Sequence, residues 1–536
     1  MRSPKNQRTV IGSTAMINVR GKDFIIKTAV LLIYGTITLI GALNHEMWLD
    51  EAQAWVIARD TELSDLFAVL KAEGHPPLWY IILMPFAKLG FPVEYGSLIS
   101  WFFMTASAAV LLYIVKADLV LKISILCSSG FLYLNSIMLR SYCLIPLLLF
   151  LIAAVYPKRK ERPVVLGILL ALLANTHVFI AGIVGMIGLY MLWEFFSDIK
   201  NNTLEQNARR GLGLLTAGLG VLLLVLPLIG SVSENEAVIS DIPSVTSILR
   251  TAVFSLSRVA EVCLDYSELP FPVPLILSLL IQFGVVFIFI LLRHWRKALA
   301  IEIGFIAVYI LTCEILWIPL PNRTAVYLLS FFFALCFTQS EKPVYNNGRG
   351  KRLMLSSQSM KKFIAFVVKC DENAQKTISI ILTVIFAVTV PVGVSFLYKD
   401  LGSEFCAAGG TARLIKENLE EDAVFVTFWR GLPELSVYLP DNLIYSVPYG
   451  EFTSYMKLTA PAEKIDAEKI CGELSEYSHV YILYLTDDAF PDDSFIFSYS
   501  GGIAYGSNKR YFAVCKYNEQ EIYHYADIYT GQASWR

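Results

Sequence analysis

The chain has 536 residues, of which 55% are hydrophobic and only 17% are charged, and its mean hydropathy is +0.56. Soluble proteins carry roughly 25% charged residues, so this composition excludes an ordinary soluble protein and indicates a membrane protein with several spans. The 44 basic and 46 acidic residues form no long basic block, which argues against nucleic acid as a partner. The nine cysteines show no CxxC or Cys/His spacing, so we expect no zinc site and no redox motif.

The N-terminal segment, residues 1–23, is rich in basic residues and precedes an apolar run over residues 24–43. No A-x-A cleavage site comes before Asn44, so this run is interpreted as an uncleaved membrane anchor. The excess of positive charge predicts a cytoplasmic N-terminus. Residues 44–76 would then lie outside.

Ten further spans are expected from length and from the basic loops between them, because cytoplasmic loops carry the excess of Lys and Arg. Residues 77–90 are excluded from this count because they are short, contain Pro85 and would reverse the sidedness of every later basic loop; they predict a juxtamembrane helix on the outer face. The total is therefore eleven spans. They predict a mainly α-helical membrane bundle over residues 24–397. The ten later spans are residues 96–115, 119–139, 141–156, 163–177, 179–196, 211–230, 271–292, 298–318, 324–338 and 377–397.

Residues 398–536 are more polar and predict a small extracytoplasmic α/β domain. Helices are expected at 409–421 and 434–439, and strands at 423–429, 479–485 and 510–517. A further short helix is expected near 243–260, in an outer loop.

Ionisable residues gather at the outer ends of the predicted spans, although they come from distant parts of the sequence. In a membrane protein such residues are candidates for function. Asp50 is expected in the first turn of a helix beginning near "DEAQAW". The alternative for each arginine is a position at the membrane interface, where long cationic side chains reach water, and the alternative for His75 is a helix cap before Pro76 and Pro77. The residues are Asp50, Glu51, His75, Arg140, His177 and Arg323, with Tyr142 beside Arg140.

Three motifs carry a resemblance to a known family. "LDEAQAWVIARD" with Asp50–Glu51, "GHPPLWY" with His75 to Leu78, and "RSY" with Arg140 and Tyr142 together resemble membrane glycosyltransferases of the GT-C superfamily. The protein O-mannosyltransferases and the transferases of aminoarabinose to lipid A are the most similar groups. The resemblance covers about residues 24–200. The chain lacks the lumenal repeat domain of the eukaryotic mannosyltransferases, and the C-terminal domain matches neither group.

The resemblance implies an enzyme that moves a sugar from a polyprenyl-phosphate carrier to an acceptor hydroxyl on a lipid, a polysaccharide or a protein. It implies Asp50 as the base, Glu51 as a supporting residue and an outer catalytic loop over residues 44–90. Adjacent helical residues point about 100° apart, so Asp50 and Glu51 are not expected to share a retaining mechanism, and one base predicts inversion. Arg140 and Arg323 are the candidate ligands of the phosphate, and His75, Tyr142 and His177 are candidate binding residues.

No cofactor and no metal are expected, because Asp50 and Glu51 alone make a poor metal site. The rival hypothesis is a polytopic transporter or lipid flippase, although no internal repeat is found and the span centres carry almost no charge. The compact chain favours a bacterial cell membrane, with membrane lipids as further partners.

Overall fold

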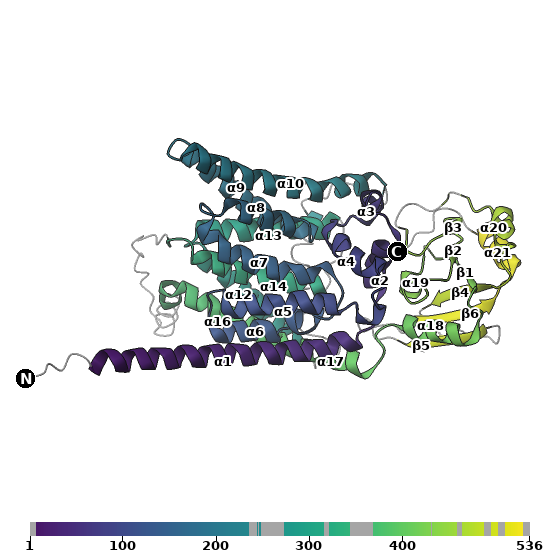
Figure 1. Ribbon diagram of the computed structural model, residues 1–536, viewed down its shortest axis with the longest axis horizontal. Helices are drawn as coiled ribbons and strands as arrows, with labels where there is room; N and C mark the ends of the chain where they lie inside the picture. Colours follow the sequence, from purple (N-terminus) through teal and green to yellow (C-terminus); the bar gives the residue numbers. More distant parts are fainter. Residues whose placement is uncertain are drawn as a thin grey trace, which may run out of the picture.

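The computed structural model describes residues 7–234, 244, 246–247, 273–315, 321–343, 368–429, 431–457, 462, 464–486, 495–501 and 510–528. These residues form a bundle of helices and a smaller α/β unit at one end of it (Figure 1). Helix α1 runs along the bundle, and its N-terminal end lies at the end opposite the α/β unit. The expected helix near 243–260 lies outside the described residues except at 244 and 246–247.

The helices of the bundle differ widely in length, and α2, α3 and α4 lie between the longer helices and the α/β unit (Figure 1). In chain order they are α1 (Gln7–Asn44), α2 (Leu49–Asp60), α3 (Leu66–Glu73), α4 (Leu78–Lys88), η1 (Val93–Tyr95), α5 (Leu98–Tyr113), α6 (Leu119–Cys127), η2 (Gly130–Leu134), η3 (Ser141–Cys143), α7 (Leu144–Val155), η4 (Tyr156–Lys158), α8 (Pro163–Ala174), η5 (Val178–Ile180), α9 (Ala181–Asp198), α10 (Leu204–Glu234), α12 (Val273–Leu292), α13 (Arg296–Ile315), α14 (Pro321–Thr338), α16 (Ala374–Val388) and α17 (Val390–Gly402).

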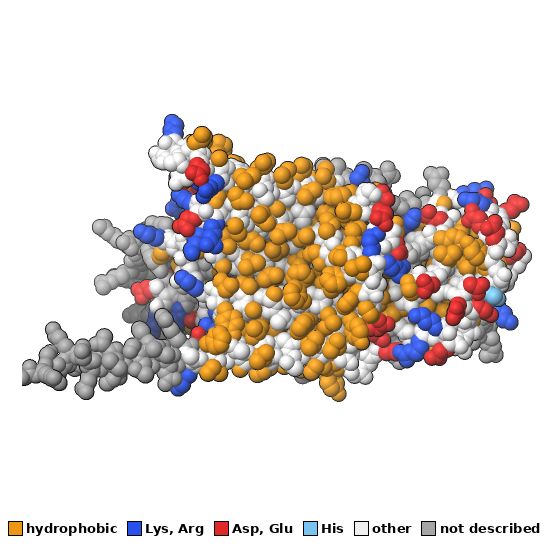
Figure 2. All heavy atoms as spheres, viewed as in Figure 1, with side chains coloured by type: hydrophobic (Ala, Val, Ile, Leu, Met, Phe, Trp, Pro, Cys, Tyr) orange, Lys and Arg blue, Asp and Glu red, His pale blue; other side chains and the backbone are white. Residues whose placement is uncertain are grey.

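Six helical segments in the described part of the chain are long and apolar enough to cross a membrane. They are Gly21–Asn44, Val93–Tyr113, Ser141–Lys158, Val178–Asp198, Leu204–Pro227 and Ala374–Gly402. Figure 2 shows a broad band of hydrophobic side chains across the visible face of the bundle, with charged side chains at both ends of the band. The chain is therefore a mainly helical membrane protein.

Shorter apolar helices lie within three of the other expected spans. They are Pro163–Ala174, Leu279–Leu292 and Ala325–Thr338, and a fourth, Leu78–Lys88, corresponds to the expected juxtamembrane helix. A helix of 12 residues such as α8 is about 18 Å long, less than the roughly 30 Å of a bilayer's hydrocarbon core. The count of eleven spans therefore stays a prediction.

One expected span is not a continuous α-helix, and this part of the prediction is wrong. Residues 119–139 were expected to form one helix, but α6 ends at Cys127 and a π-helical turn, η2, follows it. The Ser128 hydroxyl donates to the carbonyl of Ile125, which competes with continuation of the helix. Gly130 also lies so close to Ala325 that a Cβ atom there would be 2.7 Å from the Ala325 Cβ, so η2 packs tightly on α14.

The expected span over 377–397 corresponds to two helices, α16 and α17, which meet at Thr389. Pro391 removes one backbone donor in the first turn of α17, where an α-helix tolerates its absence. Asp400, near the end of α17, is thereby brought to the end of the bundle that carries α2.

Small residues allow close helix packing at several positions in the bundle. A Cβ atom on Gly182 of α9 would lie 2.3 Å from the backbone oxygen of Gly304 on α13. Such approaches are typical of helix pairs in membranes, where packing rather than water exclusion drives association.

Substituting Gly182 by Val is expected to lower the free energy of unfolding by about 2–3 kcal/mol, because backbone atoms of α13 must move to admit the side chain. The matched control is Gly185→Val on the same helix, where an added Cβ would have no atom within 4 Å. Thermal unfolding of the full chain in detergent measures both. Equal losses would contradict the packing of α9 on α13.

In the described residues of the α/β unit, six strands form a mixed sheet with the order β3-β2-β1-β4-β6-β5. Strand β1 pairs in parallel with β2 and β4, and the other pairs are antiparallel. Alternate residues of β1 face opposite sides: Phe425 packs with α18 and α19, whereas Val424 and Val426 pack with α20 and α21. The elements are α18 (Ala407–Asn418), β1 (Val424–Thr427), α19 (Pro433–Ser436), β2 (Ile444–Ser446), β3 (Glu451–Phe452), α20 (Ala467–Leu474), β4 (Val480–Thr486), β5 (Phe495–Gly501), β6 (Arg510–Lys516) and α21 (Glu519–Ile528).

The five elements expected in this unit are confirmed, with ends that differ by a few residues. Strands β2, β3 and β5 and helices α20 and α21 were not predicted. Strands of two and three residues are too short for a period of two to stand out.

Candidate active site

Asp50 lies in the first turn of α2, as predicted, and forms an ion pair with Arg140. Its Oδ2 atom is 2.9 Å from Nη1 of Arg140, although the two residues are 90 positions apart. The Asp50 side chain is 35% exposed, whereas that of Arg140 is 13% exposed. The Asp50 carboxylate is therefore partly open to solvent, whereas its cationic partner is mostly covered.

Glu51, the neighbouring acidic residue, is buried and holds several segments of the chain together. Its carboxylate accepts a hydrogen bond from the Trp48 backbone N–H at 2.9 Å and one from the Leu139 backbone N–H. Trp48 caps α2, and Leu139 directly precedes Arg140. One carboxylate thus fixes both the beginning of α2 and the position of the arginine that meets Asp50.

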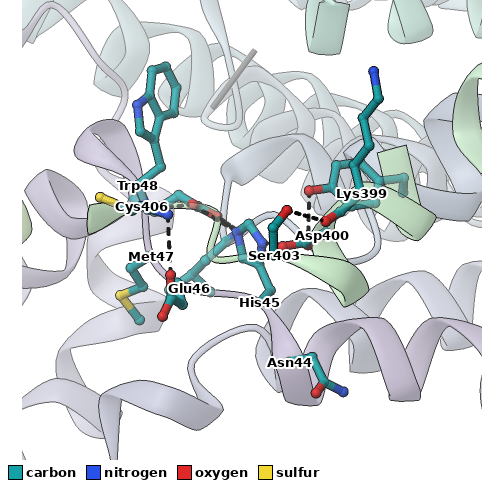
Figure 3. A network of polar contacts seen from close by, with 12 residues as sticks. Asn44, His45, Glu46, Met47, Trp48, Lys399, Asp400, Ser403 and Cys406 are labelled. Carbon is teal, nitrogen blue, oxygen red and sulfur yellow. Dashed lines mark hydrogen bonds and ion pairs between the residues drawn. The ribbon is translucent and has the colours of Figure 1, made fainter. Parts of the chain in front are cut away.

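His45 links Glu51 to the end of α17. Its Nε2 atom is 3.0 Å from Glu51 Oε2, and its Nδ1 atom is 2.8 Å from Asp400 Oδ2, which also accepts a hydrogen bond from the Tyr133 hydroxyl at 2.9 Å. Figure 3 shows the His45 ring between Asp400 and the segment that carries Glu46, Met47 and Trp48.

The charge of His45 follows from these contacts. Burial alone would lower the pKa of its imidazole, but the nearby carboxylates of Glu51 and Asp400 raise it to about 10. His45 is therefore a cation at neutral pH and balances part of the charge of two buried carboxylates. Sequence reasoning missed His45 and Asp400, which lie 355 positions apart.

Glu73 is a second carboxyl group near the pair of Asp50 and Arg140, and it was not predicted. The residue is 8% exposed, and Gln53 Nε2 donates a hydrogen bond to its Oε1 at 2.8 Å. Its pKa is raised to about 7, mainly because the carboxyl group is buried. The charge of Asp50 also raises this pKa, whereas the Gln53 hydrogen bond and the charge of Arg140 lower it. Glu73 therefore changes its charge near neutral pH, next to both partners of the ion pair.

The predicted residues His75, Tyr142 and His177 come together beside Arg140. The Arg140 guanidinium lies 5.9 Å from the centroid of the Tyr142 ring, and the Tyr142 ring stacks on that of His177 at 5.2 Å. The Tyr142 hydroxyl and His177 Nε2 are 3.2 Å apart, and the His75 and His177 rings meet edge to face at 6.1 Å. These contacts form a continuous row from the arginine to the turn that follows Glu73.

The alternative interpretation of His75 as a helix cap is wrong in its detail. Pro77 is the N-cap residue of α4 and makes no side-chain cap bond. The Nδ1 atom of His75 instead donates to the carbonyl oxygen of Glu73 at 2.7 Å, where α3 ends at Gly74 with a φ of 64°. His75 thus stabilises the turn that presents Glu73.

Arg323, the second predicted phosphate ligand, lies in the first turn of α14. Its side chain lies outside the described residues, so its role stays a prediction. Within the described part of the chain, no group of three His, Cys, Asp or Glu residues is arranged to hold a metal ion.

The α/β unit contacts this site directly through Gln53. The Gln53 amide donates to the Met456 carbonyl at 2.8 Å and accepts from the Met456 N–H at 2.8 Å, while also donating to Glu73. Arg59 at the end of α2 donates to the Ser436 carbonyl at 3.1 Å, and the Met47 N–H donates to the Tyr438 hydroxyl at 3.1 Å. Segments of the α/β unit therefore form part of the surroundings of α2.

Comparison with known protein families finds no family model that matches the chain. A search of curated proteins also finds no similar sequence. The functional interpretation therefore depends on the residues and their geometry.

Proposed function

We propose that the chain is an integral membrane glycosyltransferase of the GT-C type. It would move a sugar from a polyprenyl-phosphate carrier to an acceptor hydroxyl at the end of the bundle that carries the α/β unit. The observation that carries this proposal is the partly exposed Asp50 carboxylate held beside the Arg140 guanidinium. A base and a phosphate ligand are the two groups that this reaction needs.

The donor phosphate would replace Asp50 as the partner of Arg140. A guanidinium presents paired donors that match phosphate oxygens, so a phosphate competes well with a single carboxylate contact. Its binding would release the carboxylate toward the acceptor. The ion pair would thus be the resting state of the site, and donor binding would prepare the base.

In the reaction, Asp50 would take the proton of the acceptor hydroxyl as its oxygen forms a bond to the anomeric carbon. The bond from that carbon to the phosphate oxygen would break, and the polyprenyl phosphate would leave with its charge stabilised by Arg140. Glu51 cannot serve as a nucleophile while both of its oxygens accept hydrogen bonds inside the protein. A single base favours inversion at the anomeric carbon.

The remaining residues would shape the substrate site. The row of Tyr142, His177 and His75 offers aromatic faces and ring nitrogens beside Arg140, which suit a sugar phosphate. The contact between Gln53 and Met456 supports a role of the α/β unit on the acceptor side. The sidedness of the basic loops favours an extracytoplasmic site and a cytoplasmic N-terminus.

Glu73 predicts a pH dependence of donor binding. Because its pKa is about 7, it gains a negative charge as the pH rises from 6 to 8, and this charge competes with the donor phosphate for Arg140. The KM for the donor should increase roughly fivefold over this range, as for an interaction of about 1 kcal/mol between partly buried charges. Glu73→Gln should remove the increase.

The measurement is initial-rate kinetics at several pH values with the full chain in detergent or vesicles. The control is Glu62→Gln, which removes an exposed carboxylate between α2 and α3 that pairs with Lys88. If the KM of the Glu73→Gln variant still increased with pH, the pH dependence of donor binding would come from a group other than Glu73.

The proposal itself is tested by a transfer assay. The purified chain in vesicles receives short-chain polyprenyl-phosphate sugars with a labelled sugar, together with lipid, oligosaccharide and peptide acceptors. A transferase converts the donor into free polyprenyl phosphate and a labelled product. Movement of intact donor across the bilayer without cleavage would instead support the transporter or flippase hypothesis.

A further inference from the structure

A cleft lies between the end of α1 and helix α18 of the α/β unit, on a different set of residues from the ion pair of Asp50 and Arg140. Its volume is about 430 Å³, within the range of about 300–1,000 Å³ that ligand pockets have. It is lined by Leu43, Asn44, His45, Glu46, Glu94, Gly409, Ala412, Arg413, Lys416 and Tyr438. The α18 residues in this set recur at helical spacing, so one face of α18 forms one wall.

The two walls of the cleft carry opposite charges. Arg413 and Lys416 project from α18 and are exposed. Glu46 and Glu94 come from the bundle side. Within the part of the chain that the structure describes, no ion pair is formed by Arg413, by Lys416 or by Glu94, so the charges face the cleft without neutralising one another.

Glu46 is held in place on its wall. Its Oε2 atom accepts a hydrogen bond from the Cys406 N–H at 3.2 Å, and Figure 3 shows this contact beside His45. Its Oε1 atom faces Gly409, because a Cβ atom at that glycine would be 3.3 Å from it. The absence of a side chain at position 409 keeps the space in front of this carboxylate open.

The cleft lies where the first membrane-spanning segment ends. The candidate span Gly21–Asn44 finishes with two of the residues that line the cleft. Ile40 and Leu43, on the last turns of α1, are 48% and 44% exposed, as expected for side chains that contact lipid. The cleft therefore opens at the level of lipid head groups, with an apolar surface directly below it.

We propose that this cleft binds the head group of a zwitterionic phospholipid that carries a primary amine. The phosphate would lie against Arg413 and Lys416, and the ammonium group would donate to Glu46 and Glu94. A purely anionic head group would face two carboxylates, and a quaternary ammonium could not donate hydrogen bonds to them. This inference is independent of the proposed transferase activity.

Native mass spectrometry of the delipidated full chain tests the proposal with three lipids of equal acyl chains. We expect phosphatidylethanolamine to bind at least about tenfold more tightly than phosphatidylcholine or phosphatidylglycerol. The double variant R413A/K416A should lose most of this binding, since basic residues near the membrane surface attract phosphate groups. Glu94→Gln should remove the preference for phosphatidylethanolamine over phosphatidylglycerol.

The control for the double variant is K464A/K469A, which removes two cations of the same unit that do not line the cleft. Thermal unfolding of each variant is the check that it is folded. Equal binding of the three lipids, or unchanged binding in R413A/K416A, would overturn the proposal. So would binding of soluble glycerophosphoethanolamine as tight as that of the lipid, because the ligand would then be a free solute.

Discussion

Asp50→Asn should lower the rate of sugar transfer about a thousandfold, the usual contribution of a positioned general base. Asparagine has nearly the same shape as aspartate and can still meet Arg140, but it cannot accept the proton of the acceptor hydroxyl. Because the Asp50 side chain is 35% exposed, the free energy of unfolding should change by no more than about 1–2 kcal/mol. Loss of transfer without loss of folding is therefore the expected result.

The control for this variant is Asp60→Asn at the other end of α2. Asp60 pairs with Arg59 and is similarly exposed, so the control makes the same chemical change on the same helix. Transfer of labelled sugar and thermal unfolding are measured for both variants. Transfer at an undiminished rate in Asp50→Asn would remove the base from the mechanism.

Arg140→Gln should weaken transfer on the order of a hundredfold, through both a larger KM for the donor and a smaller kcat. In the proposed mechanism, the guanidinium would stabilise phosphate in the bound donor and still more in the leaving group, where negative charge develops. Arg140→Lys should recover only part of the activity, because an ammonium group lacks the planar fork that matches two phosphate oxygens. This partial rescue separates phosphate binding from a merely structural ion pair.

The control is Arg209→Gln, which removes an exposed arginine that pairs with Glu205 within α10. Donors of increasing lipid length and a donor without sugar, used as an inhibitor, show which part of the donor the arginine contacts. An Arg140→Gln enzyme with unchanged donor affinity and a normal rate would contradict the assignment of the phosphate site.

The location of the candidate site could be predicted from the sequence. Counting the spans assigns each residue at the end of a span to one side of the membrane, and the candidate residues are all assigned to the same side. Asp50, His75, Arg140, Tyr142 and His177 come from four separate segments of the sequence, yet each follows or precedes an apolar run on the same predicted side. Their proximity in the structure agrees with that prediction. The ion pair itself was not predicted, because its formation depends on the rotation of α2 about its axis.

Residues that support the site were missed because no local signal marks them. Glu73 is the last residue of α3, and charged residues are usually exposed. In the structure the chain turns at Gly74, and Gln53, which also bonds Met456, donates a hydrogen bond to the buried Glu73 carboxyl. In the C-terminal unit, by contrast, a local signal for α20 was present, since Asp466 accepts a cap bond from the Lys469 N–H.

The most direct measurement is a structure of the full chain with a non-reactive polyprenyl-phosphate sugar bound. We expect its phosphate about 3 Å from the Arg140 guanidinium, with the Asp50 carboxylate released and facing the anomeric carbon from the side opposite the phosphate. A donor head group at the end of the bundle away from the α/β unit would contradict the account. An intact contact between Asp50 and Arg140 beside a bound donor would contradict it equally.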